Sequence, residues 1–258
     1  MLPFERLRAL ARYSGDDTEL VLETADCLAD FGPDPTQLVT VCRRLLAHHP
    51  ACGPLWWLCA RVVAAPDPAD AARDAAAQLA GDRTAARLAA VLPFPHDDPI
   101  AVLGWPEITG TALAERPDLD VVVVRDARTT ARLRWRVDAG ELRVRMVDHT
   151  EVMAASPSHL LVEVAAMAPG AALVPQGTSD LCWSLGTTKL WLVAGVGRLL
   201  PGRLFDVARA EVERADDPTV ETIELTRVDR IAGPAGLDPV DRFTARVDCP
   251  VAPELLRL

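Results

Sequence analysis

Val121-Val122-Val123-Val124 decides the fold, because four consecutive β-branched residues without polar alternation predict a strand buried on both faces. Similar apolar runs rich in Val, Leu and Ile are Ile100–Leu103, Leu142–Val147, Leu160–Val164 and Leu190–Val193. The helix-length segments between these runs are Glu107–Glu115, Thr129–Asp138, Thr150–Ser156 and Thr178–Leu185. Strands that alternate with helices predict a parallel α/β sheet. One further strand candidate, Val220–Leu225, lies in the tail of the chain.

The residues before this alternation predict only helices. Asp16 and Asp34 occupy N-cap positions ahead of apolar residues with helical spacing, and Pro35 suits the first position of a helix. Further helices are expected over Leu55–Ala65, Ala69–Ala80 and Arg83–Val91. The proline-rich stretch from residue 93 to residue 99 predicts a boundary. We therefore expect a helical domain over 1–95 and an α/β domain over 96–258.

Composition excludes several classes of protein. The 258 residues carry 27 basic and 37 acidic side chains, for a net charge of −10. A chain this acidic does not resemble a general nucleic-acid binder, and it contains no apolar run of the roughly 18 residues that a membrane helix requires. The first residues lack the apolar core of a secretion signal, so a cytoplasmic protein is expected. None of the six cysteines forms a zinc-binding motif, so we expect no metal or cofactor.

Several segments, taken in order and with their spacing, resemble the initiation-factor-2B-like family. This family contains regulatory subunits of translation initiation factor 2B, methylthioribose-1-phosphate isomerase and ribose-1,5-bisphosphate isomerase. The segments that carry the resemblance are Leu45–Pro50, Pro54–Leu58, Val121–Arg128, Val144–Thr150, Leu190–Ala194 and Ile231–Leu237. The resemblance implies a helical N-terminal domain followed by a Rossmann-like domain with a parallel sheet.

The positions that carry the isomerases' chemistry differ in this chain. The resemblance places a catalytic cysteine in the loop after the first strand, but that loop reads Gly104-Trp105-Pro106-Glu107. Ala165 stands where the isomerases have an aspartate, and His49 corresponds to a phosphate-contacting arginine. An Asn-Lys pair is replaced by Pro175-Gln176-Gly177. Proton transfer between sugar carbons needs a positioned acid and base, which alanine and proline cannot supply. We therefore expect a non-catalytic protein that binds a partner protein or senses a phosphorylated sugar or nucleotide.

Candidate ligand-binding residues follow the predicted strands, because open parallel sheets bind ligands at the carboxyl ends of their strands. Arg128 is the leading candidate, since a guanidinium suits phosphate and its position matches the family, although a surface ion pair is an equal alternative. The other candidates are Gly104, Gly110, Gln176, Gly177, Thr178 and Arg198. The alternative for Gly104 and Gly110 is an ordinary strand–helix loop. For Gln176, Gly177 and Thr178 it is plain helix capping, and for Arg198 it is a crossover turn with a solvated side chain.

Catalysis of altered chemistry is the alternative function. An isomerase or transferase acting on a phosphorylated sugar or nucleotide would use Asp148, His149 and Glu163, with His149 as an acid–base group oriented by Asp148. A solvated or capping Asp–His pair is the competing interpretation.

Self-association is expected from the apolar segments Val164–Val174 and Trp183–Leu200. If they formed an exposed patch, its size would be unusual on a monomer, and the family pairs through its Rossmann halves. We therefore expect a homodimer.

Overall fold

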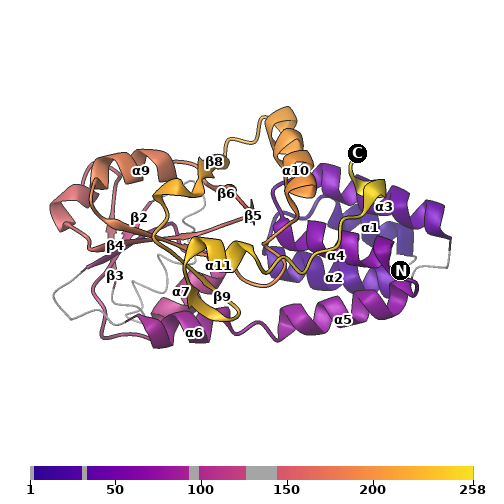
Figure 1. Cartoon of the computed structure of the whole chain (residues 1–258), viewed down its shortest axis with the longest axis horizontal. Coiled ribbons are helices and arrows are strands. Elements are labelled where there is room, and N and C mark those ends of the chain that lie inside the picture. The colour runs from indigo at the N-terminus through magenta and orange to yellow at the C-terminus, as the bar shows by residue number, and fades with distance from the viewer. Residues whose placement is uncertain (1–2, 31–33, 93–98, 126–143, 258) are drawn as a thin grey trace.

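The computed structural model describes residues 3–30, 34–92, 99–125 and 144–257 (Figure 1). The helices of the first part are α1 (Pro3–Leu10), α2 (Asp17–Ala29), α3 (Pro35–His48), α4 (Gly53–Ala64), α5 (Pro68–Ala80) and α6 (Thr84–Val91). The later helices are α7 (Glu107–Ala114), α9 (Thr178–Leu185), α10 (Gly202–Ala215) and α11 (Val240–Thr244), with 3₁₀ turns at Val152–Ala155, Leu225–Arg227 and Pro253–Leu255. The strands are β1 (Ile100–Leu103), β2 (Val121–Val124), β3 (Val144–Val147), β4 (His159–Glu163), β5 (Ala166–Ala168), β6 (Ala171–Pro175), β7 (Lys189–Val193), β8 (Val220–Glu224), β9 (Arg230–Gly233) and β10 (Gly236–Asp238).

The first five helices form a bundle at one end of an elongated molecule (Figure 1). Side-chain oxygens of Asp16 and Asp34 cap α2 and α3, as the sequence predicts, and Pro35 opens α3. Helix α4 lies in the middle of the bundle, where Trp56 and Trp57 are both fully buried. The predicted helices of this part are confirmed.

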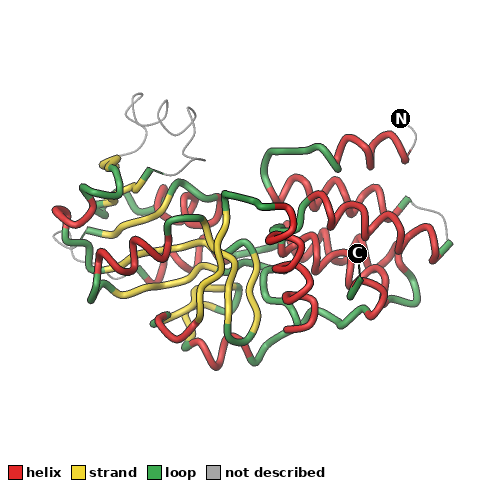
Figure 2. Tube along the Cα trace, turned by 90° about the horizontal axis from the view of Figure 1, so that it is seen from above, coloured by secondary structure: helices red, strands yellow, loops and turns green. Residues whose placement is uncertain are grey.

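The main sheet has seven strands in the order β10-β9-β7-β4-β1-β2-β3, all parallel except β10. Alternate valines of β2 enter different cores: Val122 and Val124 pack with α9 and the second sheet, while Val121 and Val123 pack with α6 and α7. Helix α6 therefore belongs to the cover of the sheet rather than to the bundle (Figure 1). Figure 2 shows the strands gathered toward one end of the molecule and the helical bundle at the other. The predicted parallel α/β sheet, buried on both faces, is confirmed.

A second, antiparallel sheet of β5, β6 and β8 was not expected. The strand predicted at Val220–Leu225 exists, but it pairs with β6 in this small sheet instead of extending the main one. The helix predicted over Thr150–Ser156 is only a 3₁₀ turn, Val152–Ala155. The predicted segment Thr129–Asp138 lies outside the described residues.

Later parts of the chain complete the core of the helical bundle. Leu204 and Phe205 of α10, Leu173 of β6 and Leu255 near the C-terminus belong to the same hydrophobic cluster as Trp56. Figure 1 shows α10 and the C-terminal segment beside the bundle. The boundary predicted between residues 95 and 96 lies outside the described residues and stays a prediction.

The apolar segments that suggested a dimer are mostly buried within this chain. Between Val164 and Val174, seven side chains are at most 2% exposed, and β7 is buried from Leu190 to Val193. Trp183, at 78% exposed, is the exception. The premise of a large exposed patch is therefore wrong, because these segments form the second sheet and the centre of the main sheet. The homodimer itself stays a prediction.

Candidate functional site

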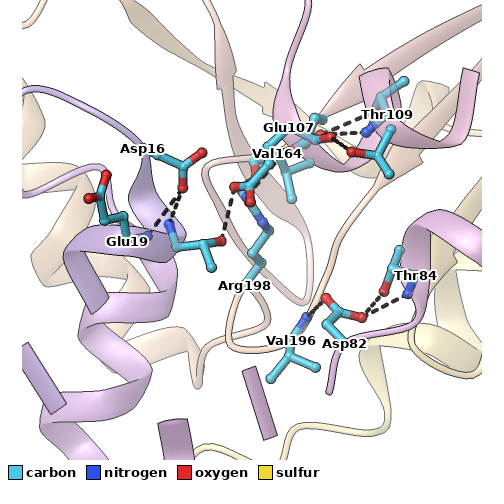
Figure 3. Close-up of polar contacts among 12 residues, drawn as sticks. Asp16, Glu19, Asp82, Thr84, Glu107, Thr109, Val164, Val196 and Arg198 are labelled. Atoms are coloured by element: carbon cyan, nitrogen blue, oxygen red, sulfur yellow. Dashed lines mark hydrogen bonds and ion pairs between the residues drawn. The ribbon is translucent and has the colours of Figure 1, made fainter. Parts of the chain in front are cut away.

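A cleft of about 200 Å³ opens where the carboxyl ends of β1 and β4 meet the start of α2. Among the described residues that line it, Arg198 is the single basic one. The acidic residues around it are Asp16, Asp17, Glu107 and Glu163. Parallel sheets bind ligands at this edge, so the cleft is the candidate site. Figure 3 shows how its polar side chains meet.

Glu163, the last residue of β4, holds the start of α7. Its Oε2 accepts hydrogen bonds from the backbone N–H of Thr109 at 2.9 Å and from the Thr109 hydroxyl at 3.2 Å. The carboxylate thus occupies the electropositive end of the helix, where Pro106, the N-cap residue, supplies no side-chain acceptor. Burial raises the pKa of Glu163, and the charge of Arg198 and the Thr109 donors counter that shift only in part.

Arg198 pairs with Glu163 in the interior. Its Nη2 lies 3.0 Å from Glu163 Oε1, and its Nη1 donates to the carbonyl of Val164. Only 6% of the arginine side chain and 5% of the glutamate side chain are exposed. Burial alone would lower the pKa of Arg198, but the nearby acids, above all Glu163, raise it on balance. The predicted charge of Arg198 is therefore present at the cleft, and the alternative of a solvated turn is wrong.

The bundle contacts helix α7 through the start of α2. The hydroxyl of Thr18 donates to Glu107 Oε2 at 2.9 Å, across the cleft. Glu107 as a whole is exposed, but partial desolvation of its carboxyl group and a hydrogen bond with Asp16 raise its pKa to about 7. This cleft therefore contains a carboxyl group that changes charge near neutral pH.

Asp82 connects the bundle to the loop after β7. One of its oxygens caps α6 through Thr84, and the other accepts the Val196 N–H at 2.9 Å. A Cβ at Gly195 would lie 2.4 Å from that second oxygen, so the loop approaches this closely because residue 195 is glycine.

Gly104 and Gly110, both predicted as ligand-binding residues, have separate structural roles. Gly104 follows β1 at φ +67°, and its N–H donates to the carbonyl of Val124. Gly110 lies inside α7, where a Cβ would meet the indole of Trp105 at 2.5 Å. Gly110 therefore makes room for Trp105, and an ordinary strand–helix loop describes this segment better.

Gln176, Gly177 and Thr178 do form a helix start, at α9. Gly177 is the N-cap at φ +93°, and Gln176 is exposed. The Thr178 hydroxyl donates to the carbonyl of Pro175, while the N–H of the next residue, Ser179, donates to Glu221 Oε1 at 2.9 Å. A carboxylate of the chain itself therefore occupies this helix start too, rather than a capping hydroxyl.

Asp148 and His149 lie apart from Glu163. They follow β3, which two intervening strands separate from β4, so their backbones are about 14 Å away. Asp148 is exposed and pairs with Arg125 at 2.8 Å, and the ring of His149 lies against Gly177. The three residues proposed for the alternative enzyme are thus not brought together. Arg128 lies outside the described residues, so its role in binding stays a prediction.

The positions of the isomerases' chemical groups are occupied by structural contacts. The carbonyl of Ala165 accepts the N–H of Gly53, at the start of α4. His49 Nε2 lies 2.8 Å from the carbonyl of Leu10, which ties α1 to α3. No cysteine is among the described residues that line the cleft.

Sequence reasoning missed the bundle's contribution to this site. It interpreted Asp16 and Asp17 only as the start of a helix, and it did not single out Thr18 or Asp82. Asp16 and Asp82 have only the ordinary local signal of a helix cap. The packing of the bundle is what places Asp16 and Asp17 at the cleft and brings Thr18 and Asp82 to Glu107 and Val196 beside it. No pattern along the chain could have identified them.

The fold and cleft define a class: a helical bundle joined to a Rossmann-like α/β sheet, with a cleft between them. Within this class, the chain has the fold of eIF2B subunits. It aligns with eIF2B β from Chaetomium thermophilum over 98% of this chain and 92% of that one, with a TM-score of 0.70 and 13% identity. The eIF-2B translation initiation factor of Pyrococcus horikoshii OT3 aligns over 94% and 98%, with a TM-score of 0.70 and 11% identity.

A third neighbour is a chain of the tetrameric eIF2B-β2-δ2 complex of C. thermophilum, with a TM-score of 0.71, 14% identity, and coverage of 94% of this chain and 92% of that one. At the level of sequence, no family model and no curated protein matches the chain. The resemblance stated from the sequence is thus confirmed for the fold.

The described residues contain neither a candidate membrane helix nor a candidate metal cluster. None of their helices combines the length and the apolar character needed to cross a membrane. Nor do three or more of their His, Cys, Asp or Glu side chains gather in a way that could hold a metal ion.

Proposed function

We propose that this chain is a non-catalytic protein of the initiation-factor-2B group that acts in the cytoplasm by binding. Its target is a partner protein or a small phosphorylated ligand, a sugar phosphate or a nucleotide. One observation carries the proposal: Glu163, the buried acid of the cleft, uses both oxygens to hold α7 and Arg198. Both oxygens of this carboxylate thus make structural contacts, which supports a structural role for Glu163 over proton transfer.

Charge favours the partner over the phosphorylated ligand. Asp16, Asp17 and Glu107 line the cleft, and its arginine is already paired. A phosphate there would meet more negative than positive charge. The neighbour from the β2δ2 complex belongs to an assembly, and we propose by analogy that this chain pairs with a second copy of itself.

Light scattering at micromolar concentration tests the pairing. The proposal predicts twice the 27.8 kDa mass of one chain. The mass of a single chain would contradict it. A thermal-shift panel of sugar phosphates and nucleotides tests the sensing role, and a panel without any shift would remove that role and leave partner binding.

Glu107 is the observation that favours the alternative, an enzyme of altered chemistry. A carboxyl group with a pKa of about 7 in a cleft suits general acid–base catalysis. The alternative predicts turnover of a phosphorylated sugar or nucleotide that falls at least roughly 100-fold in Glu107→Gln. Turnover that is unchanged in this variant would exclude Glu107 from the chemistry.

A further inference from the structure

The surroundings of the Glu163 carboxylate are those of an anion-binding site. A backbone N–H at the start of a helix, the hydroxyl of Thr109 and the guanidinium of Arg198 all donate toward one small space (Figure 3). Helix starts and guanidinium groups are the donors with which proteins most often hold carboxylates and phosphates. Thr109 is fully buried and Arg198 is 5% exposed, so these donors are shielded from water.

We propose that Glu163 is a built-in ligand that fills an anion subsite of the cleft and keeps free anions out of it. Glu163, which fills the subsite, is the last residue of β4 and lies 54 residues along the chain from Thr109. A molecule that binds in this cleft would therefore not place a phosphate or carboxylate between Thr109 and Arg198. This inference concerns the subsite alone, and it holds whether the chain binds a partner or a small ligand.

Helix α7 needs an acceptor at this place. Its N-cap is Pro106, which makes no side-chain cap, so the orphan N–H groups of the first turn depend on a group from elsewhere. Arg198 depends on the same carboxylate for neutralisation, since its other hydrogen-bond acceptor within the described part of the chain is the uncharged carbonyl of Val164. Removing the carboxylate would leave two kinds of buried donors unsatisfied at once.

The adjoining cleft gives a free anion access to the subsite. Glu163 and Arg198 both line the cavity of about 200 Å³. Shortening Glu163 to alanine removes the carboxylate together with one methylene group and extends that cavity toward Thr109. A formate, acetate or phosphate ion that enters would meet the donors that the side chain has left.

Chemical rescue tests this inference. The melting temperature of Glu163→Ala is measured with increasing formate, acetate or phosphate, against chloride at equal ionic strength. At saturation we expect an increase of about 5–10 °C over chloride, the effect of a ligand at roughly 100 times its dissociation constant on a chain of this size. The wild-type protein should show no such increase, because Glu163 occupies the subsite.

Two matched variants make the result specific. Glu163→Gln retains the shape of the side chain, so it should not respond to the anions. Glu163→Ala with Arg198→Met lacks the guanidinium, so its rescue should be lost. If Glu163→Ala is recovered only as unfolded protein, its refolding yield with formate against chloride replaces the melting temperature.

Two results would overturn the inference. One is a Glu163→Ala protein whose melting temperature or refolding yield responds to the anions no more than it does to chloride. The other is rescue that persists unchanged in the double variant, because the anion would then bind elsewhere. Neither readout depends on dimer formation or on a cellular ligand, so failure here is distinguishable from failure of the proposed function.

Discussion

Replacing Arg198 with methionine is expected to destabilise the protein severely. The substitution keeps most of the apolar volume but leaves the Glu163 carboxylate, 5% exposed, without its counter-charge at 3.0 Å. Breaking a buried pair from one side costs about 3–5 kcal/mol of unfolding free energy. The carbonyl of Val164 also loses its donor, so we expect the upper half of this range.

The loss should depend on pH. Without Arg198, the folded-state pKa of Glu163, which burial already raises, should rise further above its unfolded value near 4.5. Protonation then favours the folded state, so the variant is most stable below about pH 4.5 and loses stability as the pH increases through the folded-state pKa. The deficit relative to wild type should therefore be larger at pH 8 than at pH 5.

Guanidinium-induced unfolding, followed by tryptophan fluorescence at both pH values, measures these free energies. The double variant Arg198→Met with Glu163→Gln should be more stable than Arg198→Met alone, because no charge remains uncompensated. A deficit below about 1 kcal/mol at pH 8, typical of a surface pair, would refute the reasoning. So would a deficit of the same size at both pH values.

Three further predictions concern Glu107, the loop after β7 and Arg128. Because the pKa of Glu107 is raised in the folded state, the free energy of unfolding of the wild type should fall by about 1 kcal/mol between pH 4.5 and 7. This figure is reduced for solvent screening, since Glu107 is exposed. The free energy of unfolding of Glu107→Gln, measured across the same range, should lack this decrease. Gly197→Ala should lower the free energy of unfolding by about 1–3 kcal/mol, because φ is +78° and the new Cβ would lie 3.0 Å from the Pro54 Cα. Gly202→Ala, where a Cβ would meet open space, should change that free energy by no more than about 0.5 kcal/mol, as measured by denaturant unfolding. Arg128→Ala should weaken ligand binding by about 1.5–3 kcal/mol with little change in the melting temperature of the free protein, and a large decrease of that temperature would instead mark a structural residue.

The alternation of apolar runs and helices was enough to predict the parallel sheet, because a strand such as Val121–Val124 has few other stable environments. The second sheet could not be predicted in this way. Its strands Ala166–Ala168 and Ala171–Pro175 are short and rich in alanine, which has little β propensity. They are strands because β5 pairs with β6 and β6 pairs with β8.

The candidate site was predictable only in part. Glu163 and Arg198 were both identified as residues at the ends of strands, but nothing along the chain shows that they pair 35 residues apart. Negative charge does lie at the starts of α7 and α9, where the sequence suggested a bound ligand. The charge comes from Glu163 and Glu221, which lie 54 and 42 residues from the amides that they accept from. Such long-range contacts have no local signature.

Turnover of phosphorylated sugars, followed by phosphorus NMR, tests the central claim most directly. The protein is incubated at pH 7 with sugar 1-phosphates, the substrate class that the isomerases of the resembled family imply. The account predicts no conversion above the buffer control, because Glu163 is held by Thr109 and Arg198 and no cysteine is among the described residues that line the cleft. Conversion to a ketose phosphate by the wild-type protein, abolished in Glu163→Gln or Glu107→Gln, would contradict it.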